Sequence, residues 1–333
     1  MTYFSAPYHD RIMQGAFANI TWWSKLGYNP AVATNEEDVW SAGGSYVFPP
    51  SAQQLEVISS STNDAGTSIF DGTATGGSTT TLEDSAKDFT AGTPVAAGDC
   101  VLLDKAGASP EWGYVTGVAE TTLTVAGGFS GGGSAAGRGY HVVDKSAATG
   151  AQAVLISYLN ASYAQDTEIV ILNGTTAVPT VQSDLFRING FRVVAAGSGA
   201  VAAGNLSLRE TDDSPVYSYI TAGFTRARNS AYTVPAGKTL YVNEWNAGAA
   251  TGNDSKVQTA RLFLKFNREP DTGFVTQSIF YTGMELLVSN GVAVVQCQLP
   301  GAFPAQTDIK VSALGLTGFN GPITSFLRGY LIG

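Results

Sequence analysis

The residues best suited to catalysis or metal binding are few and widely separated in the sequence. The two histidines are His9 and His141, and the two cysteines are Cys100 and Cys297. A zinc site or a Ser-His-Asp triad brings several such groups together, and these four have neither metal-ligand nor redox spacing. We therefore interpret the histidines as surface or packing residues. The cysteines are interpreted as small buried hydrophobic residues of a protein made in a reducing compartment.

Two glycine motifs match functional fingerprints only in part. Residues 128–132, GFSGG, fit the Gly-x-Ser-x-Gly nucleophile elbow, which needs a helix after the serine. The following residues, GSAAGRG, do not predict a helix, and we expect residues 127–139 to form a mobile loop tip. The sequence Gly197-Ser198-Gly199 is followed by a predicted strand, whereas a dinucleotide site needs a helix N-terminus. We predict no bound cofactor.

Three acidic clusters, at residues 36–38, 83–84 and 212–213, have the oxygen ligands that Ca²⁺ prefers. None has the spacing of a calcium-binding loop, and we interpret them as solvated turns. A carboxylate pair for glycoside hydrolysis stays open, because such a pair meets in space rather than in sequence. No motif predicts a metal site, and we expect the protein not to be an enzyme.

The composition favours β-structure and argues against two classes of partner. Charged residues make up 14% of the 333 residues, against about 25% in most soluble domains, and glycine is abundant. The formal net charge is −9, so the surface repels phosphate and we expect no nucleic-acid partner. No apolar run approaches the ~20 residues that span a bilayer. The first fifteen residues also lack the apolar region of a signal peptide.

Sequence patterns predict an all-β chain of three parts. Residues 1–50 have no sustained period and are predicted to form an extended N-terminal arm. Residues 72–143 have short strand patterns separated by glycine-centred turns, which is typical of a small all-β barrel. Residues 51–71 together with 144–333 have the patterns of many antiparallel strands, and we predict a jelly-roll-like β-sandwich.

Six aromatic residues distinguish the predicted arm from an ordinary linker. Rings of this size are costly to expose, so each must pack on the body of the chain or on a neighbouring subunit. We predict that they form an interface: Trp22, Trp23, Tyr28, Trp40, Tyr46 and Phe48.

Several segments resemble a family of virion structural proteins from tailed bacteriophages. They are residues 26–30 (LGYNP), residues 40–46 (WSAGGSY) and residues 59–64 (SSSTND). The likeness continues through residues 168–175, AGSGAVAAGNLSLR and YTVPAGKTLYV, and so covers most of the chain. Leu26 and Tyr28 depart from the Phe and Arg of the family pattern. The resemblance implies a place in the virus particle and no enzymatic activity.

These observations predict a non-enzymatic protein that decorates or cements the exterior of a capsid, after synthesis in the host cytoplasm. Its expected partners are the major capsid protein or other virion proteins, and itself as a homo-oligomer, with a trimer favoured. Two alternatives stay open, namely an adsorption protein that binds a host-surface glycan and a jelly-roll shell protein. We expect removal of residues 1–50 to abolish attachment while both β parts stay folded.

Overall fold

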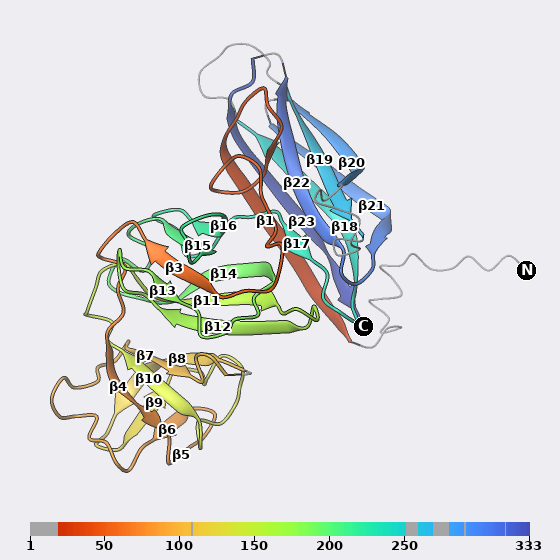
Figure 1. Cartoon of the computed structure of the whole chain (residues 1–333). Helices are drawn as coiled ribbons and strands as arrows, with labels where there is room; N and C mark the ends of the chain where they lie inside the picture. The colour runs from red at the N-terminus through yellow and green to blue at the C-terminus, as the bar shows by residue number, and fades with distance from the viewer. Residues whose placement is uncertain (1–18, 108, 251–258, 269–279, 290, 317) are drawn as a thin grey trace, which may run out of the picture. The chain divides into compact units, whose positions relative to one another are not determined.

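In the computed structural model, the described residues are 19–107, 109–250, 259–268, 280–289, 291–316 and 318–333. Their regular secondary structure consists of strands alone, and neighbouring strands pair antiparallel (Figure 1). The prediction of an all-β fold is therefore confirmed. The chain separates into two compact units. Unit 1 comprises Met1–Phe48, Ser162–Ala164 and Arg228–Gly333, and unit 2 comprises Pro49–Ala161 and Gln165–Ala227.

Unit 1 is an antiparallel β-sandwich with jelly-roll connectivity. Its two sheets have the strand orders β1-β23-β18-β21 and β17-β22-β19-β20, and the short β2 pairs with β22. The strands are β1 (Ile20–Val32), β2 (Glu37–Asp38), β17 (Tyr232–Thr233), β18 (Thr239–Ala249), β19 (Thr259–Asn267), β20 (Tyr281–Ser289), β21 (Gly291–Phe303), β22 (Asp308–Leu316) and β23 (Gly321–Ile332).

The pairing of these strands is nested. Apart from β2, the first strand pairs with the last, β17 with β22, β18 with β21 and β19 with β20. One long antiparallel ribbon that wraps into two sheets gives this order, which is the topology of a jelly roll. The predicted jelly-roll sandwich is therefore present in unit 1.

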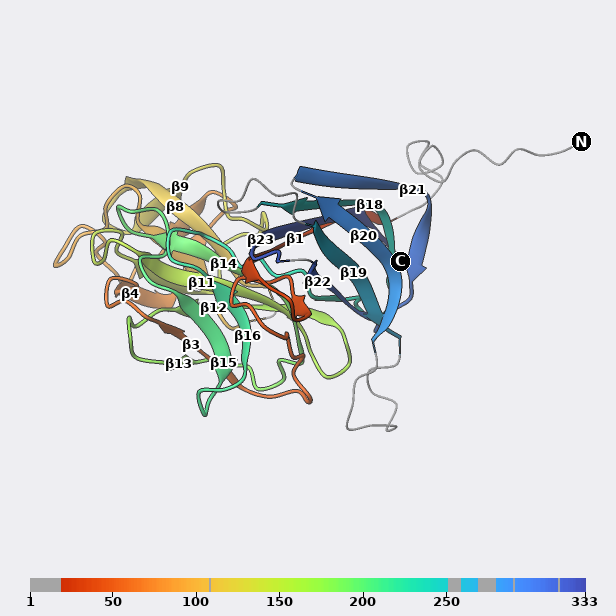
Figure 2. The ribbon, with the colours of Figure 1, turned by 90° about the horizontal axis from the view of Figure 1, so that it is seen from above.

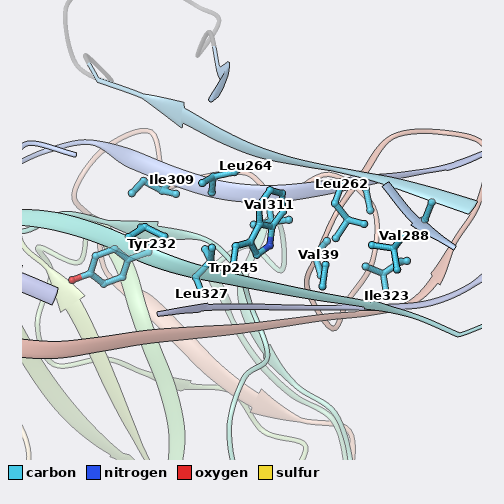
Figure 3. Close-up of a cluster of buried hydrophobic side chains, with 14 of the residues drawn as sticks. Val39, Tyr232, Trp245, Leu262, Leu264, Val288, Ile309, Val311, Ile323 and Leu327 are labelled. Carbon is cyan, nitrogen blue, oxygen red and sulfur yellow. The ribbon is translucent and has the colours of Figure 1, made fainter. Parts of the chain in front are cut away.

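One hydrophobic cluster fills the space between the two sheets of unit 1 (Figure 3). Trp245 on β18 and Leu327 on β23 face Leu262 and Val311 of the opposite sheet, and all four side chains are fully buried. Alternate residues of these strands point into the core, as the two-residue period of a strand requires. Each such side chain contributes about 1.5–3 kcal/mol by leaving water.

Unit 2 consists of three sheets. Their strand orders are β12-β11-β14, β13-β3-β15-β16 and β4-β10-β7-β8-β9-β6-β5. The strands are β3 (Leu55–Ser59), β4 (Ser68–Thr73), β5 (Gly76–Gly77), β6 (Thr81–Glu83), β7 (Cys100–Leu103), β8 (Glu111–Val118), β9 (Thr122–Val125), β10 (Gly139–Val143), β11 (Ala151–Leu159), β12 (Gln165–Ile171), β13 (Val178–Pro179), β14 (Arg187–Ala196), β15 (Leu206–Glu210) and β16 (Val216–Ile220).

The sheets of unit 2 enclose separate hydrophobic cores. The three-stranded and four-stranded sheets enclose one cluster, in which Ile156 and Tyr217 are fully buried. The seven-stranded sheet surrounds a second cluster with Phe89 at its centre, and we call β4–β10 the inserted module. A smaller cluster that includes Cys100 and Leu155 joins this module to β11, β12 and β14.

The predicted division of the chain differs from the structure in two respects. The predicted sandwich of residues 51–71 and 144–333 is divided between the units, because strands β3 to β16 pack around the cores of unit 2 and strands β17 to β23 around that of unit 1. Residues 20–48 are not a separate arm either, because β1 pairs with β23 and completes a sheet of the jelly roll. Residues 1–18 of the predicted arm lie outside the described residues.

Candidate interaction surfaces

The segment after β1 folds back over β22 and is held there by acidic side chains. The Asp38 carboxylate accepts a hydrogen bond from the Tyr46 backbone N–H at 2.6 Å and from Lys310 Nζ at 2.9 Å. Glu36 accepts one from Ser312 Oγ at 2.6 Å and another from Lys265. The prediction that residues 36–38 form a solvated turn is therefore wrong.

The two carboxylates titrate differently because their surroundings differ. Burial raises the pKa of Asp38, although Lys310 opposes this effect. Burial also tends to raise the pKa of Glu36, but the hydrogen bonds from Lys265 and Ser312 lower it below its usual range. The pKa values of both carboxylates are therefore set by contacts inside unit 1.

The motif residues of this segment form a compact turn. Asn29 Nδ2 donates to Glu37 Oε2 at 3.1 Å and to the Asp38 carbonyl at 3.0 Å. Trp40 Nε1 donates to the Gly44 carbonyl at 3.2 Å. Gly43 and Gly44 have φ angles of 73° and 68°, which other residues rarely adopt. These residues thus have a structural role within unit 1.

Three of the six predicted interface aromatics are buried in unit 1. Trp23, Trp40 and Tyr46 have exposed fractions of 7%, 6% and 3%. Trp23 belongs to the jelly-roll core, and the Trp40 and Tyr46 rings meet edge to face with centroids 5.3 Å apart. These three side chains stabilise the fold, and assigning them to a contact surface was wrong.

The other three aromatics lie nearer the surface of unit 1. Tyr28 is half-buried beneath the Arg228 guanidinium, whose carbon lies 4.0 Å from the ring centroid. Phe48 is half-buried and stacks on Phe280 at 5.8 Å. Trp22 is 68% exposed and tilts against Tyr330. Among the six, Trp22 is the side chain most available for contact with another molecule.

Large exposed apolar side chains lie on two strands of unit 1, β20 and β21. Leu287 on β20 is 57% exposed, and Val292 and Val294 on β21 are 75% and 56% exposed. β20 and β21 are each the last strand of their sheet and lie close together at one side of the jelly roll (Figure 2). We call this the β20–β21 edge. Such edges present unpaired backbone N–H and C=O groups.

No protein-family model matches this chain, and no curated protein matches it. Among solved structures, one described as Infectious Bursal Virus Derived T=1 Particles aligns at 11% identity with a TM-score of 0.14. The alignment covers 98% of this chain and 75% of that chain.

The residue types suited to metal binding or catalysis do not gather at one site in the described part of the chain. The described residues contain no group of three or more His, Cys, Asp or Glu side chains placed to hold a metal ion. No helix in that part of the chain is long and apolar enough to cross a membrane. His9 and the Cys297 side chain lie outside the described part, and Cys100 is buried as predicted.

The glycine-rich loop at residues 127–139 is anchored rather than mobile. Glu111 Oε2 accepts hydrogen bonds from the Gly131 and Gly133 N–H groups at 2.9 and 3.1 Å, and Phe129 is buried. Arg138 Nη1 donates to Glu111 Oε1 at 2.6 Å. Burial alone would raise the pKa of Glu111, but these hydrogen bonds together lower it below its usual range.

The buried carboxylate of Asp64 gives residues 59–64 a structural role in unit 2. Asp64 Oδ1 accepts hydrogen bonds from the Ala151 and Ala203 N–H groups at 2.7 and 2.8 Å. Its Oδ2 accepts from Ser59 Oγ at 2.6 Å and the Gly204 N–H at 2.7 Å. The segments at residues 59–64 and near residue 204 therefore meet at one side chain.

Proposed function

We propose that this chain is a structural protein of a tailed-bacteriophage particle that decorates or cements the exterior of the capsid. The jelly roll of unit 1 supports this proposal, because that fold recurs in viral capsid proteins as well as in lectins and cupins. Because one fold can serve many functions, this support is by analogy. The motif resemblance in the sequence adds independent support.

The observation that carries the proposal is the apolar β20–β21 edge. Exposed apolar residues that cluster on edge strands mark protein contacts, because burying them releases ordered water and pairs the free backbone groups. Leu287, Val292 and Val294 provide such a surface. We propose that copies of the chain associate through it, with a trimer favoured.

Attachment to the particle needs a contact other than a free N-terminal arm. Residues 20–48 fold into unit 1, so they do not extend across neighbouring subunits as a free arm. Trp22 lies on β1, at the opposite end of its sheet from β21, and its ring is largely exposed. We propose Trp22 as a contact with the major capsid protein.

Sedimentation equilibrium and binding to particles that lack the protein test the two contacts separately. We expect the double variant Val292→Ser, Val294→Ser to sediment as a monomer, and Trp22→Ala to associate normally but bind particles weakly. Val181→Ser removes a 62% exposed apolar side chain from unit 2 and should match the wild type in both assays. A monomeric wild type, or equal binding by all variants, would contradict the proposal.

The jelly-roll topology also favours a second candidate, a protein that forms the shell itself. A cryo-EM map of the particle separates the two. A decorating protein lies on top of a closed shell built by another chain, whereas a shell protein occupies the contiguous lattice. Particles without a decorating protein should assemble and lose thermal stability, whereas particles without a shell protein should not assemble.

A further inference from the structure

The inserted module of unit 2 has an open cavity of about 340 Å³ on its surface. Its walls come from β4, from β10 and from the turn at residues 104–107 that follows β7. The volume lies at the lower end of the ~300–1,000 Å³ typical of ligand pockets. The polar side chains that line it include Asp71, Lys105 and His141.

The turn that forms one wall of the cavity is held in place from two sides. Asp104 accepts hydrogen bonds from the Gly139 N–H at 3.0 Å and from Arg138 Nε at 2.7 Å. The Lys105 carbonyl accepts one from the Ile169 N–H at 2.6 Å, and the Ala106 carbonyl accepts one from a glutamine side chain at 2.7 Å. A wall fixed in this way binds a ligand without a further ordering cost.

The polar groups of the cavity offer both charges and a neutral ring. Asp71 and His141 lie directly opposite each other in the β4–β10 register, which places their side chains on one face of the sheet. Burial lowers the pKa of His141, and Lys105 adds to this effect, so the imidazole is neutral at pH 7. Among the described residues, neither the Asp71 carboxylate nor the Lys105 ammonium makes a side-chain hydrogen bond.

The hydrogen bonds of Ser68 bear on which nitrogen of His141 is protonated. Ser68 Oγ donates to the Phe70 carbonyl at 3.1 Å and lies 3.3 Å from His141 Nδ1. Because a hydroxyl has one proton, His141 Nδ1 donates to Ser68 in this arrangement, and Nε2 is left as an acceptor. Asp104 and Tyr140 also line the cavity, but their polar groups are engaged by Arg138 and by Asp84. The groups left for a ligand are the acceptors Asp71 and His141 and the donor Lys105.

We propose that this cavity binds a saccharide through two adjacent hydroxyl groups, one donating to Asp71 and the other accepting from Lys105. A hydroxyl both donates and accepts, so a vicinal diol satisfies the carboxylate and the ammonium together. Phosphate or a metal cation would pair with only one of these two opposite charges, and an apolar ligand would leave both charges unsolvated. The site does not depend on the proposed role in the particle.

The test is an NMR titration of the ¹⁵N-labelled full chain with glucose, galactose, mannose and N-acetylglucosamine in turn. We expect at least one sugar to shift the amide signals of Gly72, Gly139 and His141. Asp71→Asn and Lys105→Met should each weaken that binding by about tenfold or more, as for loss of a charged hydrogen bond. Glu120→Gln and Lys87→Met remove one charge of each sign elsewhere on the same module and should leave binding unchanged.

Three outcomes would overturn the proposal. The first is that no sugar shifts these signals at about 10 mM, where even millimolar affinities give high occupancy. The second is that Asp71→Asn and Lys105→Met bind as tightly as the wild type. The third is that inorganic phosphate or Zn²⁺ shifts the same amides while the sugars do not, which would assign the cavity to an ion.

Discussion

Lys310 Nζ lies 2.9 Å from Asp38 Oδ2, and the two side chains are only 14% and 6% exposed. The contact joins the segment after β1 to β22, near the other end of the sequence. An ion pair this deeply buried costs free energy to desolvate, and it is stable only because each charge compensates the other. The pair therefore helps to hold the segment after β1 on the jelly roll.

Lys310→Met should destabilise unit 1 by about 3–5 kcal/mol, because it leaves the buried Asp38 carboxylate without its counter-charge. Denaturant unfolding followed by tryptophan fluorescence measures the loss. Arg261→Met is the matched control. Its partner in an exposed pair is Glu285, with side chains 40% and 44% exposed, and such pairs contribute about 1 kcal/mol or less. Equal losses in both variants would show that burial of the Asp38 pair is unimportant.

Removal of residues 1–50 should unfold unit 1 rather than release a detachable arm. The deletion removes β1 from its sheet and exposes the core side chains that Trp23 and Val39 cover. Proteolysis monitored by mass spectrometry should cut the truncated chain throughout residues 228–333 while unit 2 resists. A truncated chain with the wild-type digestion pattern would restore the arm hypothesis.

Asp64→Ala should destabilise unit 2 by several kcal/mol, because it leaves three backbone N–H groups without their acceptor at about 1–3 kcal/mol each. Hydrogen exchange should accelerate at the amides of Ala151, Ala203 and Gly204. Asn63→Ala alters the neighbouring exposed side chain and should leave these amides protected. Unchanged protection in Asp64→Ala would mean that water replaces the carboxylate.

The inserted module should lose stability in acid through Glu111. Its folded pKa lies below the usual ~4.3 of the unfolded chain. The stabilisation is therefore fully present above that value and is lost as the pH falls through the folded pKa. Thermal melting of the full chain between about pH 6 and pH 3 should show this loss, and Glu111→Gln should remove its share of the pH dependence. An identical pH profile in the variant would assign the effect to other carboxylates.

The Cys100 thiol should be unreactive in the folded protein. Burial raises its pKa to about 12, so almost no thiolate forms at neutral pH, and the side chain is 2% exposed. In a Cys297→Ser variant, a thiol reagent should react only as fast as the chain unfolds, and immediately in denaturant. Fast reaction of the native variant would show that the cluster joining the module to β11 opens readily.

Strand signals in the sequence are clear for some strands of the structure and absent for one that is essential. The apolar run at residues 151–159 coincides with β11, because a strand buried on both faces has a continuous apolar signal. β1 was missed because Lys25, Gly27 and Asn29 occupy its inward positions after Trp23. A Cβ atom at Gly27 would lie 2.5 Å from the Val39 carbonyl oxygen. The close packing of β1 against the segment that follows it therefore requires glycine at this position.

The sequence shows which residues of the candidate surfaces are apolar, but not which of them are exposed. Aromatic content correctly marked residues 22–48 as a segment that must pack, but local sequence does not say whether its rings meet the same chain or another subunit. The exposed valines of β21 form the apolar run that predicts a buried strand. Only the tertiary structure shows that Ala293 packs against the core while Val292 and Val294 lie on an uncovered face of β21.

By itself, the sequence determined the all-β class and the positions of many strands, because alternation and turn residues are properties of neighbouring residues. The tertiary structure alone decided that β1 pairs with β23, that two units divide the strands, and that Asp64 binds three backbone N–H groups distant in sequence. The reason is that every residue offers the same backbone N–H and C=O. Strand partners are therefore selected by burial of side chains across the whole chain.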